Sequence, residues 1–493
     1  MTIFDPARRA MSRRAMLQHM AAASAALAVV PSRVLAQAPA SQSVTTALPA
    51  RGEYLIRNAL VLTMDAKLGD LPKGDIHVRD GAIVAVGPSL QAAGATVIDA
   101  TNMIALPGLI DTHWHMWGSV ARNMAGEDSK TGYFLFARAV GDVFTPEDNA
   151  RGVRLSLAEA IHSGITTVHN WAHNLPKPEF ADAELQAHVD FGGRALYGYG
   201  YAGVGMTNQP INLADLPRVQ KQWFGDRSGL LTLGIASRGP ESNSAEICKR
   251  EWDTARQLGL RISTHIGTGM ARVKQSQGVK ALAEAGLLGP DVILVHDTNY
   301  LPEDLEPLAK TGTHISMSPY TEMRTGFGFP PIQPMLDKGI NICLSVDTTV
   351  LAGNCDMFAI MKAMQNVANG AKQSEFALSP RRVLEMATID GARALGIEDR
   401  VGTLTPGKRA DIVLVRMDDL NMAPFTDGVR MIVQAAQPAN VDTVLIDGRI
   451  LKRGGRLQHI DTAKIMADAT ETMGRVRVGV EKVLERSGVS VVR

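Results

Sequence analysis

The sequence predicts an α/β protein: a (β/α)₈ barrel of the TIM type, with a small β-sandwich domain formed by the N- and C-terminal flanks. Three observations predict this fold. Short apolar runs recur roughly every thirty residues through the middle of the chain, with helical patterns between them. There are eight such runs, and alternating strands and helices imply parallel strands that close into a barrel. β-like segments stand before and after this region.

The first 36 residues differ in composition from the rest of the chain. Arg13 and Arg14 precede an alanine-rich apolar stretch, and Val34 and Ala36 occupy the positions that a signal peptidase reads. The pattern predicts a twin-arginine export signal over residues 1–36, and hence a periplasmic protein. A membrane anchor is disfavoured because the apolar stretch is short and rich in alanine.

β structure is expected on both sides of the barrel. After a polar linker at 37–52, the segment 53–107 carries short alternating apolar runs, and its "DGAIVAVG" has the turn dipeptide of a hairpin. The segment 401–455 has the same character, and we expect the two segments to form one domain because both flank the barrel. Residues 456–493 are expected to form a helical tail.

The barrel is expected over residues 108–400. Its helical stretches, such as "PEDNARGVRLSLAEAIHSG", have apolar residues at helical spacing and end in glycine. The predicted strands are "GLIDTHWH", "GITTVHNW", "RALYGYGYAG", "LLTLGIASRG", "LRISTHIG", "VILVHD", "THISMSP" and "INICLSVD".

Bulk composition restricts the partners. The 493 residues carry a net charge of +1, with 45% hydrophobic and 20% charged residues, which is typical of a globular protein and does not indicate nucleic-acid binding. No membrane association is expected after signal cleavage, and a homo-oligomer is left open. The three cysteines, Cys248, Cys343 and Cys355, have neither a disulfide nor a zinc-knuckle spacing. A small-molecule substrate is the partner expected.

Histidines gather at the ends of the predicted strands. In "PGLIDTHWH", His113 and His115 are two residues apart, so an extended strand points both to the same face, whereas two histidines of a loop are the alternative. His265 and His296 end the fifth and sixth strands, and Asp347 ends the eighth. Because barrel chemistry lies at the carboxyl ends of strands, these side chains should meet at one mouth.

The residue types predict one divalent metal ion. Imidazole and carboxylate groups without thiolates suit Zn²⁺ or Fe²⁺ at a catalytic site. His113, His115, His265 and Asp347 would hold the ion and leave a position for water, whose pKa the ion would lower. Asp347 would take the proton of that water, and His296, if it is not a metal ligand, would hydrogen-bond the attacking oxygen or polarise the electrophilic carbon of the substrate.

These motifs resemble the amidohydrolase superfamily, in the branch of cytosine deaminases, nucleoside-type deaminases and triazine chlorohydrolases. The resemblance covers about 53–455 and is carried by "PGLIDTHWH", "GITTV", "STH", "VH", "LSVD" and "GTLTPGKRADIVLV". It implies the same four metal ligands, with His296 assisting. The fourth strand ends "ASRGPES" without the lysine of two-metal relatives, so the resemblance favours a single metal.

The chain departs from this resemblance after the fifth strand. Deaminases of the branch usually read His-x-x-Glu, and the glutamate carries protons to the leaving nitrogen, whereas Thr268 stands at that position here. A threonine hydroxyl is too weak an acid to replace a carboxyl directly. Glu322 and Glu241, beyond the seventh and fourth strands, are candidates for the acid, and either is otherwise an ordinary loop carboxylate.

The pocket is expected to use aromatic and imidazole side chains. His169 and His173 either line it or are satisfied histidines of a loop. Trp117 and Tyr320 would form walls for a flat ring, whereas Trp114 is better explained as core.

The expected function is therefore a metal-dependent hydrolase that attacks a C–N or similar bond of a heterocyclic or amide-like small molecule, by deamination or amide cleavage. The alternative is an exported metal- or ligand-binding barrel that lost turnover with the glutamate.

Overall fold

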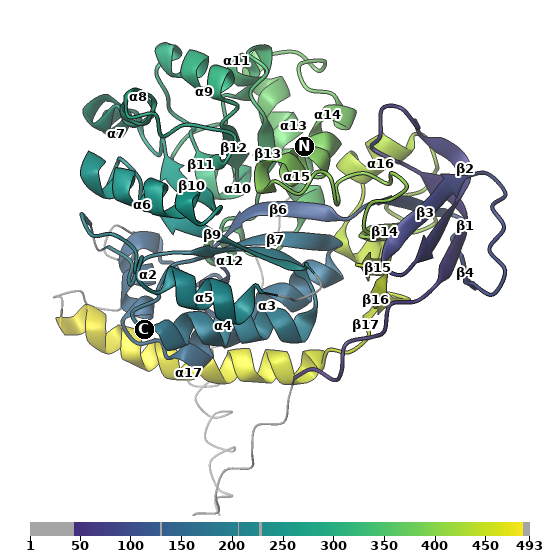
Figure 1. Cartoon of the computed structure of the whole chain (residues 1–493), viewed down its shortest axis with the longest axis horizontal. Coiled ribbons are helices and arrows are strands. Elements are labelled where there is room, and N and C mark those ends of the chain that lie inside the picture. Colours follow the sequence, from purple (N-terminus) through teal and green to yellow (C-terminus); the bar gives the residue numbers. More distant parts are fainter. Residues whose placement is uncertain (1–43, 129–130, 206, 226–228, 487–493) are drawn as a thin grey trace, which may run out of the picture. The chain divides into compact units, whose positions relative to one another are not determined.

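The computed structural model describes residues 44–128, 131–205, 207–225 and 229–486 (Figure 1). The export signal expected at 1–36, the first part of the linker and the last seven residues of the expected tail lie outside the described residues. From Val44 onward the chain forms one compact unit.

An eight-stranded parallel sheet forms the barrel, with the strands in chain order from β6 to β13. Its strands are β6 (Leu109–Trp114), β7 (Ile165–Ala172), β8 (Arg194–Tyr199), β9 (Leu231–Ser237), β10 (Arg261–Ile266), β11 (Val292–His296), β12 (His314–Met317) and β13 (Ile342–Leu344). Each of the eight apolar runs of the sequence provides one strand, so the predicted fold class is confirmed.

The barrel closes just beyond β13, between Trp114 and Asp347, which form a parallel bridge. The backbone N–H of His115 donates to the carbonyl of Asp347 at 2.6 Å, and the N–H of Asp347 donates to the carbonyl of His113 at 2.8 Å. The last seam of the barrel is thus formed by the residues that were expected to bind the metal.

Helices and short helical turns connect these strands, and their limits follow local signals. Thr145 and Asp148 form a capping box at the start of α3, with Pro146 as its first residue, and Gly192 ends α4 in the left-handed conformation at φ +67°. The helical segments are η1 (Met116–Ala121), α2 (Tyr133–Gly141), α3 (Pro146–His162), α4 (Pro178–Phe191), α5 (Leu216–Trp223), α6 (Ala245–Gln257), α7 (Met270–Ser276), α8 (Gly278–Glu284), η2 (Pro302–Asp304), α9 (Leu305–Thr311), α10 (Pro319–Arg324), α11 (Ile332–Asp337), α12 (Thr349–Ala352), α13 (Met357–Lys372), α14 (Pro380–Met386), α15 (Ile389–Leu395), α16 (Gly428–Gln434), η3 (Pro438–Asn440) and α17 (Thr462–Arg486).

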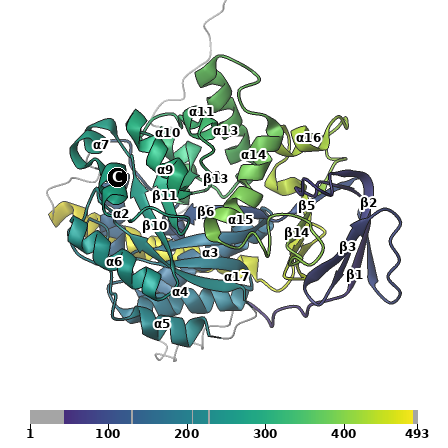
Figure 2. The same ribbon diagram turned by 45° about the horizontal axis from the view of Figure 1, so that its top comes forward.

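Both flanks contribute to one nine-stranded sheet beside the barrel (Figure 2). Its strands are β1 (Tyr54–Val61), β2 (Leu71–Arg79), β3 (Ala82–Gly87), β4 (Thr96–Asp99), β5 (Met103–Pro107), β14 (Ile412–Arg416), β15 (Val441–Ile446), β16 (Arg449–Arg453) and β17 (Arg456–Leu457). β5 and β14 pair antiparallel and so join the two flanks.

The sheet curls back on itself and encloses its own apolar core. The N–H of Gly407 donates to the carbonyl of Ile83 at 2.8 Å, and the N–H of Ile83 donates to the carbonyl of Lys408 at 2.8 Å. These two hydrogen bonds connect the edge strand β3 to the chain just before β14. Ile76 and Ile412 are among the fully buried residues inside. This curvature gives the β-rich domain a sandwich-like interior, although its strands belong to one continuous sheet.

The long helix α17, drawn in yellow in Figure 1, packs against η1, α2 and α3. Val476 and Val480 are buried in a cluster with Phe136 of α2, and Arg475 contacts the carboxylate of Asp148. Among residues 44–486 as described, no helix has both the length and the apolar character that crossing a bilayer requires.

A buried ion pair links the barrel to the β-rich domain. Arg194, at the start of β8, donates from Nε and Nη2 to the two carboxylate oxygens of Asp411 at 2.9 and 3.0 Å. Their side chains are 3% and 2% exposed, and Asp411 also accepts the N–H of Asp447 at 2.9 Å.

Asp411→Ala should lower the free energy of unfolding by about 3–5 kcal/mol, because it removes both hydrogen bonds from the buried Arg194 guanidinium to Asp411 and leaves the Asp447 carboxylate, 3.9 Å away, as its ion-pair partner. Urea denaturation measures this change. Asp253→Ala, which removes the exposed pair between Lys249 and Asp253 on α6, is the matched control and should cost no more than about 1 kcal/mol. Equal effects of the two substitutions would contradict the expectation.

Candidate active site

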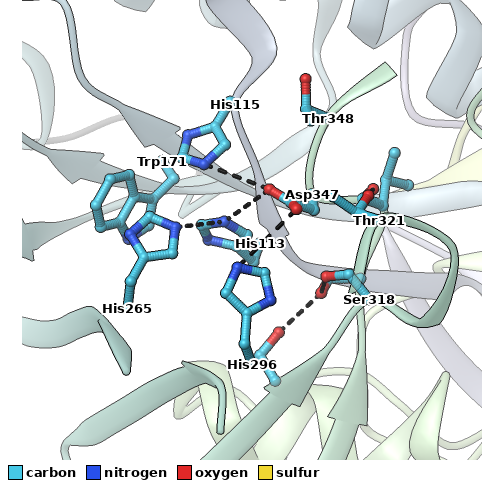
Figure 3. Close-up of polar contacts among 12 residues, drawn as sticks. His113, His115, Trp171, His265, His296, Ser318, Thr321, Asp347 and Thr348 are labelled. Carbon is cyan, nitrogen blue, oxygen red and sulfur yellow. Dashed lines mark hydrogen bonds and ion pairs between the residues drawn. The ribbon is translucent and has the colours of Figure 1, made fainter. Parts of the chain in front are cut away.

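Five side chains converge at the carboxyl ends of the barrel strands, as Figure 3 shows. Nε2 of His113 lies 3.2 Å from Nε2 of His265 and 3.3 Å from Oδ1 of Asp347. Nε2 of His115 lies 3.4 Å from the same carboxylate oxygen, and Nε2 of His296 lies 4.0 Å from Oδ2. The structure therefore brings together all five residues that the sequence placed at the mouth.

The donor set fits a divalent metal ion. Two groups of three residues each offer ligand atoms that lie within 4.8 Å of one another. One group is His113, His265 and His296, and the other is His113, His115 and Asp347. Burial, followed by the neighbouring histidines, holds the pKa values of His113 and His265 well below the usual range, so both imidazoles are neutral and offer lone pairs. Converging neutral nitrogens and a carboxylate without a thiolate are typical of a catalytic site for Zn²⁺ or Fe²⁺.

Asp111 fixes the backbone beside two of the candidate ligands, a role that was not predicted from the sequence. Its Oδ1 accepts the backbone N–H of His113 at 3.0 Å, and its Oδ2 accepts that of Val346 at 2.8 Å. These two hydrogen bonds connect β6 to the segment that carries Asp347, and the Asp111 side chain is fully buried between them. The available signal was a carboxylate in the middle of the apolar run "GLIDTHWH", where an unpaired charge would be costly.

His296 is held by a second carboxylate. Its Nδ1 donates to Oε1 of Glu322 at 3.2 Å, and the same oxygen accepts the backbone N–H of Ser318 at 2.7 Å. Burial works against the charged form of His296, but the hydrogen bond to Glu322 and the nearby carboxylates raise its pKa. His296 and Asp347 both have a left-handed backbone, at φ +77° and +63°, which is uncommon outside glycine and frequent at functional sites.

Glu322 lies in a different place from the one expected for a direct proton donor. It is fully buried on α10 and is absent from the lining of the cavity, whereas His296 lines it. Any influence of Glu322 on a substrate therefore passes through His296.

A cavity of about 630 Å³ opens onto the cluster. His115, His265, His296 and Asp347 line it on the metal side. Further lining side chains are Tyr133, His173, Tyr201, Arg238, Glu241 and Phe327. This volume lies within the usual range of small-molecule binding sites.

His173 presents a fixed hydrogen-bond donor to this cavity. Nδ1 of His173 lies 3.2 Å from the indole nitrogen of Trp117, which can only donate, and 3.4 Å from the carbonyl of Trp171; the shorter contact makes Nδ1 the acceptor. Burial lowers the pKa of His173 to about 3, so the ring is neutral and carries its proton on Nε2. Trp117 itself does not line the cavity and acts by orienting His173.

The other residues expected in the pocket lie elsewhere. His169 is fully buried below the cluster, where its Nδ1 donates to the carbonyl of Thr112 at 2.9 Å. Tyr320 is 41% exposed on α10 and does not line the cavity. Trp114 is part of the core, and Trp171 is buried with its ring 4.1 Å from that of His265.

Arg238 gives the cavity a cationic wall. Its guanidinium lies 3.6 Å from the centroid of the Tyr201 ring, and it donates to the carbonyl of Gly203. Within the described part of the chain, no carboxylate forms an ion pair with it.

The sequence profile of the amidohydrolase family matches residues 104–451. The chain is 30% identical over 426 residues to 5′-deoxyadenosine deaminase of Methanosarcina mazei, covering 85% of this chain and 96% of that protein. It is 30% identical over 434 residues to 5-methylthioadenosine/S-adenosylhomocysteine deaminase of Moorella thermoacetica, covering 86% and 99%.

Solved structures agree with this relationship. An adenosine deaminase from Xanthomonas campestris with bound zinc superposes with a TM-score of 0.80 at 25% identity, covering 87% of this chain and 100% of that one. Atrazine chlorohydrolase TrzN from Arthrobacter aurescens, complexed with zinc, shares the fold with a TM-score of 0.78 at 23% identity, covering 85% and 100%. The comparisons do not support the alternative of a binding barrel without turnover. The chain belongs to the amidohydrolase family and is a metal-dependent hydrolase of carbon–nitrogen bonds other than peptide bonds.

Proposed function

We propose that the protein is a zinc-dependent deaminase that hydrolyses the exocyclic amino group of an adenine-containing nucleoside. The observation that carries the proposal is the cluster of His113, His115, His265, His296 and Asp347 on the wall of a cavity of about 630 Å³. The names of the relatives support the substrate class, because each of those deaminases acts on a compound that contains adenine.

His113, His115, His265 and Asp347 would hold the metal. A bound zinc ion supplies the Lewis acidity that makes water nucleophilic near neutral pH. Asp347 accepts the proton of the attacking water, and His296 donates a hydrogen bond to its oxygen. His173 donates from Nε2 to an acceptor atom of the substrate and so orients the ring.

Ammonia release from a panel of compounds tests this proposal. The panel contains adenosine, 5′-deoxyadenosine, 5-methylthioadenosine, S-adenosylhomocysteine, cytosine, a triazine and an N-acyl amide. Adenine nucleosides should react, a chelator should abolish the reaction, and added Zn²⁺ should restore it more fully than Fe²⁺. Comparing ammonia release from adenine compounds that carry a neutral substituent with release from those that carry a carboxylate shows whether Arg238 contributes to substrate selection. Turnover of the triazine or the amide without any turnover of adenine compounds would overturn the proposal.

We also propose export to the periplasm by the twin-arginine route, which the motif at Arg13 and Arg14 supports. The mature protein should begin at Gln37, as N-terminal sequencing of the periplasmic fraction can show. Replacing both arginines with lysine should leave the protein in the cytoplasm with its metal bound. Export of this variant at the normal rate would point to another route.

A further inference from the structure

We propose that Glu241 is the acid that protonates the leaving nitrogen, in place of the glutamate that related deaminases carry at the position of Thr268. The proposal rests on the deaminase function proposed above. It assigns the missing group to a different strand of the barrel, because Glu241 follows β9 whereas Thr268 follows β10.

The geometry places the Glu241 carboxylate beside the vacated position. Its Oε1 accepts the backbone N–H of Gly267 at 2.9 Å, and its Oε2 lies 3.5 Å from Oγ1 of Thr268. A longer side chain at position 268 would extend into the space beside this carboxylate. The Glu241 carboxylate therefore lies beside the position at which related deaminases carry their glutamate.

Gly267 permits this close approach. It has φ +69°, and a Cβ there would lie 2.6 Å from Cα of Asp297, so a larger residue would displace the backbone that holds Glu241. The hydrogen bond from Gly267 fixes Oε1, which leaves Oε2 as the oxygen beside Thr268.

Glu241 also meets the chemical requirements better than Glu322. It lines the cavity together with His265, His296 and Asp347, whereas Glu322 does not. Its side chain is only 3% exposed, and burial raises its pKa, although the Gly267 hydrogen bond and Arg272 at 3.9 Å act in the opposite direction. A raised pKa lets a carboxyl group retain a proton to donate.

The step conserves atoms and charge. The water oxygen forms a bond to the ring carbon and gives one proton to Asp347, while a ring nitrogen takes the displaced electron pair. Glu241 then transfers its proton to the amino nitrogen. The ring nitrogen returns its electron pair, the carbon–nitrogen bond breaks, and ammonia leaves. The proton on Asp347 passes to Glu241, so that the net reaction is the exchange of an amino group for a hydroxyl group of water.

Glu241→Gln tests the proposal through its dependence on the leaving group. The kcat for an adenine nucleoside should fall by about 10² to 10⁴-fold. The kcat for the corresponding 6-chloropurine nucleoside should change far less, because chloride departs without a proton. Metal content by elemental analysis should be unchanged. Glu246→Gln, on the exposed first turn of α6, is the matched control and should behave as the wild type.

A second variant moves the carboxyl group back. Glu241→Gln combined with Thr268→Glu should regain activity on the amino substrate that Glu241→Gln lost. Equal losses on the amino and chloro substrates would show a structural role and overturn the proposal, as would a near wild-type kcat of metal-loaded Glu241→Gln. An inactive wild-type protein on every adenine compound would instead overturn the deaminase function together with this assignment.

Discussion

Asp347→Asn should lose both the metal and the activity, with kcat lowered by about 10² to 10⁴-fold even after zinc is added back. Oδ1 of Asp347 lies 3.3 and 3.4 Å from Nε2 of His113 and His115, so the carboxylate completes the proposed ligand set and also accepts the water proton. An amide cannot accept that proton and is a poorer metal ligand. Elemental analysis and steady-state kinetics measure the two losses.

The control for this substitution is Asp399→Asn, at an exposed aspartate outside the cavity lining, which should retain metal and activity. His113→Ala should lose the metal as well, since its Nε2 is shared by both groups of candidate ligands. Full metal content in purified His113→Ala protein would rule out the assigned site.

Glu322→Gln should lower kcat by about 10 to 100-fold, the usual range for a residue that orients a group at a metal site. Glutamine can still accept hydrogen bonds from Nδ1 of His296 and from the N–H of Ser318, so the variant removes the charge and leaves the geometry. The loss should be similar for amino and chloro substrates, because Glu322 acts through His296 rather than on the leaving group. Parallel assays on the two substrates measure it.

Tyr320→Phe is a suitable control for disturbance of α10, since Tyr320 lies on the same helix, is 41% exposed and does not line the cavity. A loss in Glu322→Gln that appears only with the amino substrate would contradict the expectation, because it would make Glu322 the acid.

The barrel and the metal cluster could be predicted from the sequence because both are encoded locally. Each strand is a short apolar run, and a histidine or aspartate that reaches the mouth stands at or just beyond the end of several runs: His296 is the last residue of β11, and Asp347 comes three residues after the end of β13. Parallel strands place all such ends on one side, so the convergence follows from topology without knowledge of distances.

The remaining parts of the site depend on contacts that the sequence does not encode locally. Glu322 and Glu241 both lie in segments after strands, and only the packed structure shows that one is behind His296 and the other beside Thr268. The sequence predicts Trp117 as a wall of the pocket, whereas in the structure Trp117 lies behind His173, contacts its Nδ1 and does not line the cavity. The pairing of β5 with β14, which brings Pro107 to Ile412, depends on contacts across the whole barrel.

The bridge between Trp114 and Asp347 has a consequence for the folding of this chain. The two segments that supply His113, His115 and Asp347 are neighbours in space only after all the intervening strands and helices have been laid down. A nascent or truncated chain that ends before β13 would contain every histidine of the cluster and still lack the geometry for tight binding. Metal affinity therefore reports whether the chain extends to Asp347 and the barrel has closed, and a chain with an open barrel would remain in the apo form.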